Sequence, residues 1–218
     1  MSVSAKMVKE LRERTGLGMM DCKKALGETN GDIDEAITYL RKKGMAKSAK
    51  LAGRIASEGT VTSYVHGGGK IGVLLELNCE TDFTGRNEIF QDLARDVAMH
   101  IAAANPRFLS RDEVTKDILD KEREIAHDQA IAAGKPEAIV TRIVEGKMSK
   151  YYEENCLLEQ KFVKEAKKTI QAHIDETVLT IGEKITIRRY ARFQLGEGLE
   201  KRSENFAEEV AQAASGGA

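Results

Sequence analysis

Apolar residues recur at helical spacing three times within the first forty residues. The periodic segments cover about residues 5–15, 19–26 and 33–40, and the turn signals Thr15-Gly16 and Asn30-Gly31 separate them. A segment of this length buries only a small apolar core, so we expect a three-helix unit that serves as a docking module. Its periodic apolar residues are Met7, Val8, Leu11, Ile33, Ala36, Ile37 and Leu40.

The middle of the chain has two strand-like runs followed by a helical pattern. Residues 60–65 and 71–77 are the two runs, and a Gly-rich segment over 66–70 joins them, which predicts a β-hairpin. Residues 87–104 then place their apolar side chains on one stripe, so we expect a long helix with a buried face that ends at Asn105-Pro106. The stripe consists of Phe90, Leu93, Ala94, Val97, Ala98 and Ile101.

The second half of the chain adds helices and one late strand. Charge-rich segments over about 110–133 and 136–154, and another near 164–176, are predicted as helices. Residues 185–195 alternate apolar and polar side chains, which is typical of a half-buried strand, and 203–214 are predicted as a last short helix. The order of these elements predicts an α+β fold in which helices pack on an antiparallel sheet.

Composition and charge exclude several classes of protein. Lys and Arg number 34 and Asp and Glu 35, a balance that argues against coating nucleic acid by bulk positive charge. Aromatic residues make up 5% and Trp is absent, which argues against base-stacking platforms. No apolar run approaches the ~20 residues of a membrane helix, and the first residues lack a secretory pattern. We expect a cytoplasmic protein that binds neither nucleic acid nor a membrane.

Charge is distributed unevenly along the chain. Residues 1–54 hold twelve Lys or Arg against seven Asp or Glu, and residues 41–54 contain no acidic residue. We interpret that basic stretch, punctuated by Gly44 and Gly53, as a tether. The predicted parts are a docking module at 1–44, a basic linker at 45–56, an α+β core at 57–196, and a C-terminal module and tail at 197–218.

The cysteines and glycines predict no cofactor. Cys22, Cys79 and Cys156 are widely spaced, without a C-x-x-C pair or a ligand-spaced histidine cluster, so we expect free buried thiols and no metal. Residues 67–72 match G-x-G-x-x-G, but a dinucleotide site needs that pattern between a strand and a helix, and here it lies between two strands. No arrangement of nucleophile, acid and base is evident.

The segment 78–87, Asn-Cys-Glu-Thr-Asp-Phe-Thr-Gly-Arg-Asn, falls where a predicted buried strand ends and the strongest helix begins. A strand–helix corner would present Asp82 and Phe83 rigidly, which makes them candidate functional residues. A structural alternative explains the segment equally well: Thr81 or Asp82 caps the turn, and Phe83 folds back onto the core. Physical reasoning from the residues leaves both interpretations open.

Longer motifs occur in order along nearly the whole chain. They are residues 15–26 (Thr-Gly-Leu-Gly-Met-Met-Asp-Cys-Lys-Lys-Ala-Leu), 78–83, 98–103, 134–136 (Gly-Lys-Pro), 143–147, 157–160 and 196–201. On these motifs the chain resembles the elongation factor Ts family, the guanine-nucleotide exchange factors of elongation factor Tu in bacterial-type translation. The resemblance implies a ubiquitin-associated-like three-helix module followed by a single core subdomain, and no cofactor of its own.

The resemblance also implies which residues meet elongation factor Tu. The corner formed by Thr81, Asp82, Phe83 and Thr84 would enter near the partner's magnesium and nucleotide phosphates, with Phe83 as a wedge. On the partner's nucleotide-binding domain the implied contacts are Leu11, Met19 and Met20, and on its distal domain they are Ile71, Gly72, His100 and Val163. Thr84-Gly85 stands where the family usually has Val-Ala, a departure expected to loosen the corner or alter the start of the helix.

Two sets of contacts on one subdomain predict a homodimer, because two-fold symmetry presents each patch twice. We expect the third strand, residues 185–195, to form its interface, since an exposed strand of that length needs covering. An alternative from another class is an adaptor whose N-terminal module binds helical or ubiquitin-like partners without exchange activity. An enzyme is a third alternative, for which the chain offers no catalytic constellation.

Overall fold

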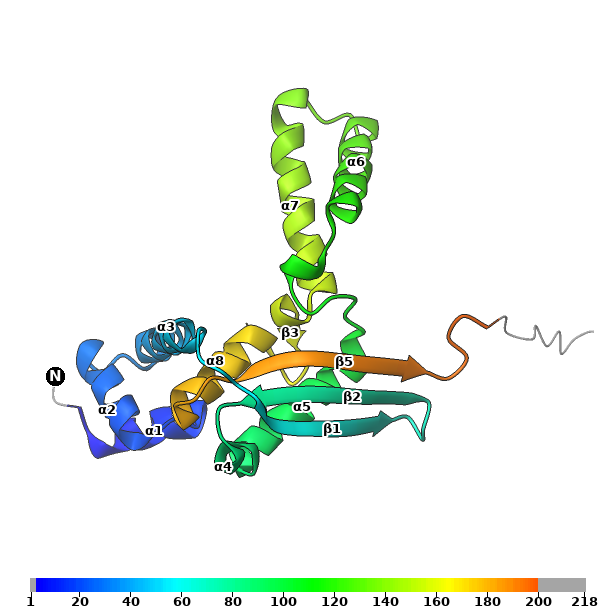
Figure 1. Cartoon of the computed structure of the whole chain (residues 1–218). Helices are drawn as coiled ribbons and strands as arrows, with labels where there is room; N and C mark the ends of the chain where they lie inside the picture. The colour runs from blue at the N-terminus through cyan, green and yellow to red at the C-terminus, as the bar shows by residue number, and fades with distance from the viewer. Residues whose placement is uncertain (1–2, 200–218) are drawn as a thin grey trace, which may run out of the picture.

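The structure is a computed structural model, and it describes residues 3–199 (Figure 1). A helical N-terminal unit precedes an antiparallel-sheet core, which confirms the predicted α+β class. The predicted helix at 203–214, and most of the predicted C-terminal module, lie outside the described residues. The elements are α1 (Ala5–Thr15), α2 (Met19–Glu28), α3 (Ile33–Leu51), β1 (Glu58–His66), β2 (Ile71–Cys79), α4 (Asp82–Gly85), α5 (Glu88–Ala104), η1 (Arg111–Glu113), α6 (Lys116–Ala132), α7 (Glu137–Asn155), η2 (Leu157–Glu159), β3 (Lys161–Phe162), β4 (Glu165–Thr169), α8 (Ile170–Ile181) and β5 (Thr186–Gln194).

The N-terminal unit consists of three helices, as the periodicity predicts. The Ser4 hydroxyl accepts the Met7 amide at the start of α1, and Gly16 ends that helix in the left-handed conformation. Asp32 caps α3 by accepting the Glu35 amide. The small core between the helices is formed by Val8, Leu11, Leu17, Cys22, Ala25, Leu26, Ala36 and Leu40, and Leu179 of α8 joins it.

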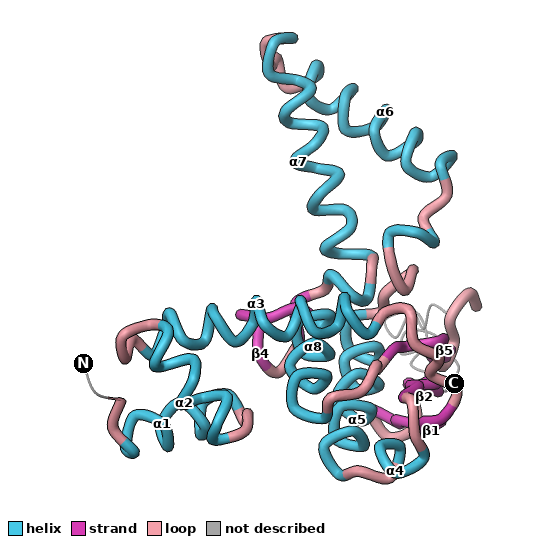
Figure 2. Tube along the Cα trace, turned by 60° about the vertical axis from the view of Figure 1, so that its left-hand side comes forward, coloured by secondary structure: helices cyan, strands magenta, loops and turns pink. Residues whose placement is uncertain are grey.

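The first part of the expected basic linker, residues 45–51, differs most from the structure, because α3 continues through it as far as Leu51, and only residues 52–57 connect α3 to β1 without a helix. The buried Gly44 lies against the backbone of Asp175 on α8, and Lys47 donates from Nζ to the Leu179 carbonyl. Leu51 then enters the main core. Lys, Arg and Ala are good helix formers, so nothing but Gly44 interrupts the helical preference, and α3 joins the unit to the core as a rigid rod (Figure 2).

The sheet has the strand order β1-β2-β5 and is antiparallel throughout. The predicted hairpin is confirmed: His66 pairs with Ile71, and Gly67, Gly68 and Gly69 turn the chain with positive φ. The Gly-rich motif therefore forms a hairpin turn. The late strand is confirmed as β5, which pairs with β2 on the side away from β1.

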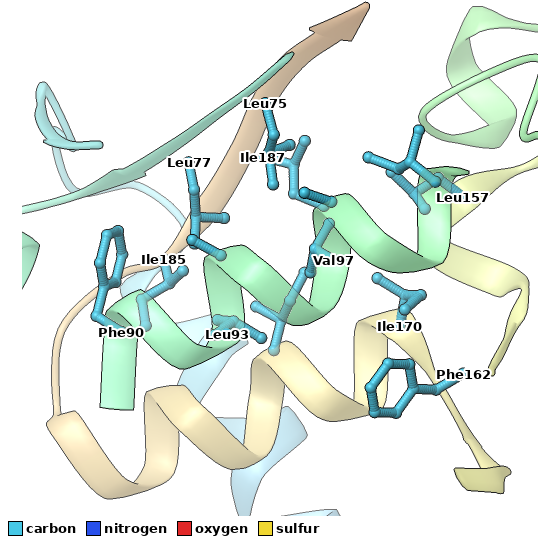
Figure 3. Close-up of a cluster of buried hydrophobic side chains, with 14 of the residues drawn as sticks. Leu75, Leu77, Phe90, Leu93, Val97, Leu157, Phe162, Ile170, Ile185 and Ile187 are labelled. Carbon is cyan, nitrogen blue, oxygen red and sulfur yellow. The ribbon is translucent and has the colours of Figure 1, made fainter. Parts of the chain in front are cut away.

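The main core lies between the sheet and two helices. Figure 3 shows α5 between the strands and α8, with Leu75, Leu77 and Ile187 above it and Ile170 below. The apolar stripe that predicts α5 is buried along its whole length, and Asn105 ends the helix in the left-handed conformation. The sheet and α8 therefore bury their apolar sides against α5.

The predicted helix near 164–176 is wrong in its first part, where β4 stands instead. Lys161 pairs with Thr169 across a short β3–β4 hairpin, and the helix begins only at Ile170. Thr169 sets that boundary, because its hydroxyl accepts the Ala172 amide and caps α8.

Helices α6 and α7 form a hairpin that projects from the rest of the molecule (Figure 1). It has a separate small core, so the two helices support each other rather than pack on the sheet. The buried residues of this core are Ala126, Ala130, Val140, Val144 and Met148.

Two glycines provide a test of the rigid α3–α8 contact. A Cβ on Gly44 would lie 3.0 Å from the Asp175 carbonyl oxygen, whereas a Cβ on Gly146, in α7, would meet nothing within 4 Å. Gly146→Ala should stabilise the protein, because alanine has the higher helix propensity. Gly44→Ala should lose this gain to overpacking against α8, so the Gly44→Ala variant should be about 2 kcal/mol less stable than the Gly146→Ala variant. Urea unfolding of both variants measures this difference. Equal stabilisation would mean that α3 is not held tightly against α8.

Candidate functional site

The Thr-Asp-Phe-Thr segment forms the single helical turn α4, between the end of β2 and the start of α5. Thr81 caps the turn: its Oγ1 accepts the Thr84 amide at 3.3 Å. Thr84 and Gly85, the last two residues of the turn, are buried, and Asn87 caps α5 directly after it. The corner is therefore held by caps on both sides and by the burial of Thr84 and Gly85.

Phe83 projects from this corner into solvent with 81% of its surface exposed. The structural alternative made two predictions for this segment. The cap by Thr81 is confirmed, and the prediction that Phe83 folds back onto the core is wrong. Asp82 is half-buried, and its Oδ2 lies 3.2 Å from Nη2 of Arg86. A bare aromatic ring beside a carboxylate on a rigid turn is suited to insertion into another surface.

Gly85 lets the corner approach β1 closely. A Cβ at this position would lie 3.0 Å from the carbonyl oxygen of Gly59, whose own φ of +135° only glycine adopts readily. The Thr84-Gly85 departure from the family pattern therefore coincides with a close backbone contact. The structure gives no sign of the looser corner that we expected from it.

Glu183, in the loop between α8 and β5, holds the corner from the other side. Its Oε2 accepts the amides of Glu80 and Thr81 at 3.2 and 3.1 Å, and its Oε1 accepts the Thr81 hydroxyl at 2.8 Å. Burial raises the pKa of this carboxyl, but the side-chain hydrogen bonds from Thr81 and Thr84, together with those from the backbone amides of Thr81 and Glu80, outweigh burial and hold the pKa below its ordinary value. Sequence reasoning missed Glu183, because nothing local distinguishes it from other surface carboxylates.

The N-terminal unit exposes the predicted methionine pair. Met19 and Met20, at the start of α2, are 57% and 75% exposed, which fits an adaptable apolar contact surface. The predicted contact by Leu11 is corrected: this side chain is fully buried in the core of the unit, so it supports the exposed surface rather than forming it.

The residues predicted to contact the partner's distal domain lie away from the corner. Ile71 and Gly72, partly exposed, begin β2 and are therefore about 27 Å from the corner that follows its last residue. Val163 is exposed in the turn between β3 and β4.

The predicted contact by His100 is corrected, because its side chain is fully buried. Its Nδ1 accepts the Val163 amide at 3.3 Å and its Nε2 lies 3.0 Å from Oε1 of Gln160, which assigns a neutral ring protonated at Nε2. Burial lowers the pKa of His100, and the Gln160 hydrogen bond opposes that effect only partly. His100 thus holds Val163 in place from inside the fold.

One face of the sheet is left uncovered. The register places Val61 and Val65 of β1, Leu74 of β2, and Ala191 and Phe193 of β5 on the side opposite α5, and all five are exposed. Ser63, Gly72 and the Glu76–Arg189 ion pair lie among them on the same face. Exposed apolar side chains grouped in this way are suited to association.

The described residues offer few features of an enzyme or a membrane protein. Among residues 3–199, no three His, Cys, Asp or Glu side chains are grouped to hold a metal ion. None of the helices described is both long and apolar enough to cross a bilayer. Cys22, Cys79 and Cys156 are buried free thiols. A surface cavity of about 600 Å³ lies between α3, α8 and the start of β5, and no corner residue lines it.

Comparison with known proteins identifies the chain. A family model described as elongation factor TS matches residues 3–197. The elongation factor Ts of Desulforamulus reducens is 60% identical over 96% of both chains, and that of Syntrophomonas wolfei is 58% identical over 95% of this chain and 97% of its own. The elongation factor Ts of Geobacter sulfurreducens is 56% identical over 98% of this chain and 99% of its own. The fold and these matches define a translation elongation factor. The chain belongs to the elongation factor Ts family.

The buried His100 predicts a pH dependence of stability. Its pKa is lowered in the folded state, so the unfolded chain binds the proton first as pH falls below about 6.5. Stability should therefore be complete above that pH and decline below it, by up to ~1.4 kcal/mol per pH unit for this group. His100→Gln should flatten the decline between pH 6.5 and 5 in urea unfolding, and His127→Gln, at an exposed histidine, should not. An unchanged slope in His100→Gln would contradict the assignment.

Proposed function

We propose that this protein is the guanine-nucleotide exchange factor of elongation factor Tu, and that it binds the GDP complex, displaces Mg²⁺ and promotes GDP release. Membership of the elongation factor Ts family supports the exchange role. The observation that supports the mechanism is the rigid corner with Phe83 exposed and Asp82 beside it. A wedge must be both bare and stiff, and the corner has both properties.

Magnesium is the sensitive element of the partner's site. It requires near-octahedral geometry at about 2.0–2.1 Å, so a small displacement of its ligands weakens it sharply. Loss of the ion removes the charge that holds the diphosphate. The factor must then bind nucleotide-free partner more tightly than the GDP complex, and by reciprocity it weakens GDP by the same factor. No covalent bond changes, so this protein is not an enzyme.

Docking of the N-terminal unit supplies the affinity in this proposal. Met19 and Met20 pack on a helix of the partner's nucleotide-binding domain, and α3 carries the unit at a fixed position relative to the core. The rigid α3 replaces the flexible tether that the charge pattern suggested. Docking of the N-terminal unit therefore also orients the corner relative to the partner.

We further propose that the working form is a homodimer. The corner and the Ile71-Gly72 end of β2 are separated by the length of that strand, so one copy presents its two contact regions at a distance. Two-fold symmetry would present each region twice around one partner. The uncovered sheet face supports an interface that involves all three strands, rather than β5 alone. The localisation proposed for this function is cytoplasmic.

The adaptor remains the second candidate from a different class. An exposed methionine pair on a helical unit would suit it, but an adaptor has no use for a stiff corner with a bare aromatic ring. The exchange assay below distinguishes the two.

The corner variants test exchange directly. Phe83→Ala removes the wedge, and a loss of ~1–3 kcal/mol of differential binding corresponds to roughly 5- to 150-fold slower GDP release. Adding Asp82→Ala to Phe83→Ala, which gives the double variant, should slow GDP release further. Fluorescent-GDP release from elongation factor Tu measures the rate, and Ile125→Ala, which truncates an exposed side chain on α6, is the matched control. Wild-type release rates in the folded double variant would contradict the proposed role of the corner.

Sedimentation tests the dimer. Wild-type protein should sediment at twice the chain mass of 24.0 kDa, and Leu74→Asp/Phe193→Asp should sediment as a monomer, because charges buried in an apolar interface remain unpaired. Ile125→Asp places the same charge on an exposed apolar position of α6 and should leave the mass unchanged. A wild-type monomer with full exchange activity at working concentration would refute the dimer.

A further inference from the structure

The loop between α8 and β5 is bound to the corner by a reciprocal pair of carboxylates. Glu183 accepts the amides of Glu80 and Thr81, while Oε1 of Glu80 accepts the Lys184 amide at 2.7 Å. Residues about a hundred positions apart in the chain thus exchange hydrogen bonds between carboxylate and backbone. Gly182 makes this possible, because its φ of +92° ends α8 and turns the chain toward the corner.

Two cations bind this region to the end of α3. Arg54, just after α3, donates from Nη1 to both oxygens of Glu80 at 3.3 and 3.1 Å. Lys184 donates from Nζ to the carbonyls of Ala52 and Arg54 at 2.7 and 2.8 Å. The end of α3, the end of β2 and the start of β5 therefore meet in one polar junction beside the corner.

Glu183 also controls the hydroxyl that caps α4. Thr81 donates its hydroxyl proton to Glu183, so the lone pairs of Oγ1 are free to accept the Thr84 amide. Without Glu183 the hydroxyl could rotate, and two backbone amides at the base of the turn would lose their acceptor. Phe83 lies within this turn, so the direction of its ring depends on the same contacts.

We propose that Glu183 is a positioning residue of the exchange corner: it fixes the one-turn helix that presents Asp82 and Phe83 to the partner. The proposal rests on the exchange function proposed above. In this role Glu183 acts through its hydrogen bonds to the corner residues, chiefly those from Thr81 and Glu80, and not by contact with the partner's nucleotide or metal. Its loss should therefore slow the step that the corner drives while leaving docking by the N-terminal unit intact.

The exchange assay separates positioning from docking. The rate of fluorescent-GDP release from elongation factor Tu is followed against the concentration of this protein. Glu183→Ala should lower the maximal rate about tenfold, because a small misplacement of a reacting group is costly, and should change the half-saturating concentration less than about threefold. Glu183→Gln should recover most of the rate, because its amide oxygen still accepts the two backbone amides. Glu113→Ala, which removes a carboxylate bound to the Leu109 amide, should match wild type.

A second measurement does not need the partner. The chain has no tryptophan, so Phe83→Trp introduces a single indole on the corner. Adding Glu183→Ala to this background should lower the fluorescence anisotropy of that indole, and adding Glu113→Ala should not, with thermal unfolding confirming that every variant is folded.

The outcomes distinguish the two proposals. If wild type accelerates release but Glu183→Ala keeps both its maximal rate and its anisotropy, the positioning role is refuted and the exchange function stands. If Glu183→Ala loses rate only in proportion to its unfolded fraction, the residue is structural and the positioning role is again refuted. If wild type fails to accelerate release, the exchange function is refuted, and a drop in anisotropy would still support the positioning of the corner.

Discussion

The burial of α5 between the sheet and α8 is the interaction on which the other features depend. Its apolar stripe shares one buried cluster with side chains of β2 and β5 and with Ile170, Ile174 and Val178 of α8. Because interiors are close-packed, the ends of these elements are fixed with them. The corner, the loop that carries Glu183 and the end of α3 are all such ends, so their mutual positions follow from one core.

A division of labour follows from this arrangement. The N-terminal unit exposes flexible, polarizable methionine side chains that can adapt to a surface, whereas the corner exposes Phe83 on a turn that is held from several directions. In the function proposed above, the adaptable surface docks and the stiff corner displaces the partner's bound ion. The continuous helix α3 joins these two surfaces, so the position of one constrains the position of the other.

Local patterns were sufficient for much of the fold. Two strand-like runs around a Gly-rich turn predicted β1 and β2, and alternation predicted β5. A stripe of period 3.6 predicted α5, because the helix buries one face and the period records that face directly. The errors lie where local signals conflict with distant contacts. Residues 165–169 carry charges typical of a helix but form the strand β4. The basic stretch after Gly44 stays helical because it packs against α8 and its Leu51 enters the main core.

The sequence by itself determined the class of fold, the capping of its helices, and the motif that carries Asp82 and Phe83, since each depends on residues a few positions apart. Only the tertiary structure decided which of those residues reach solvent. Phe83 is bare, whereas Leu11 and His100 are fully buried, and Glu183 gains its importance from Thr81, a residue 102 positions away. The physical reason is that exposure and long-range hydrogen bonding depend on which surfaces the core brings together, and no local pattern contains that information.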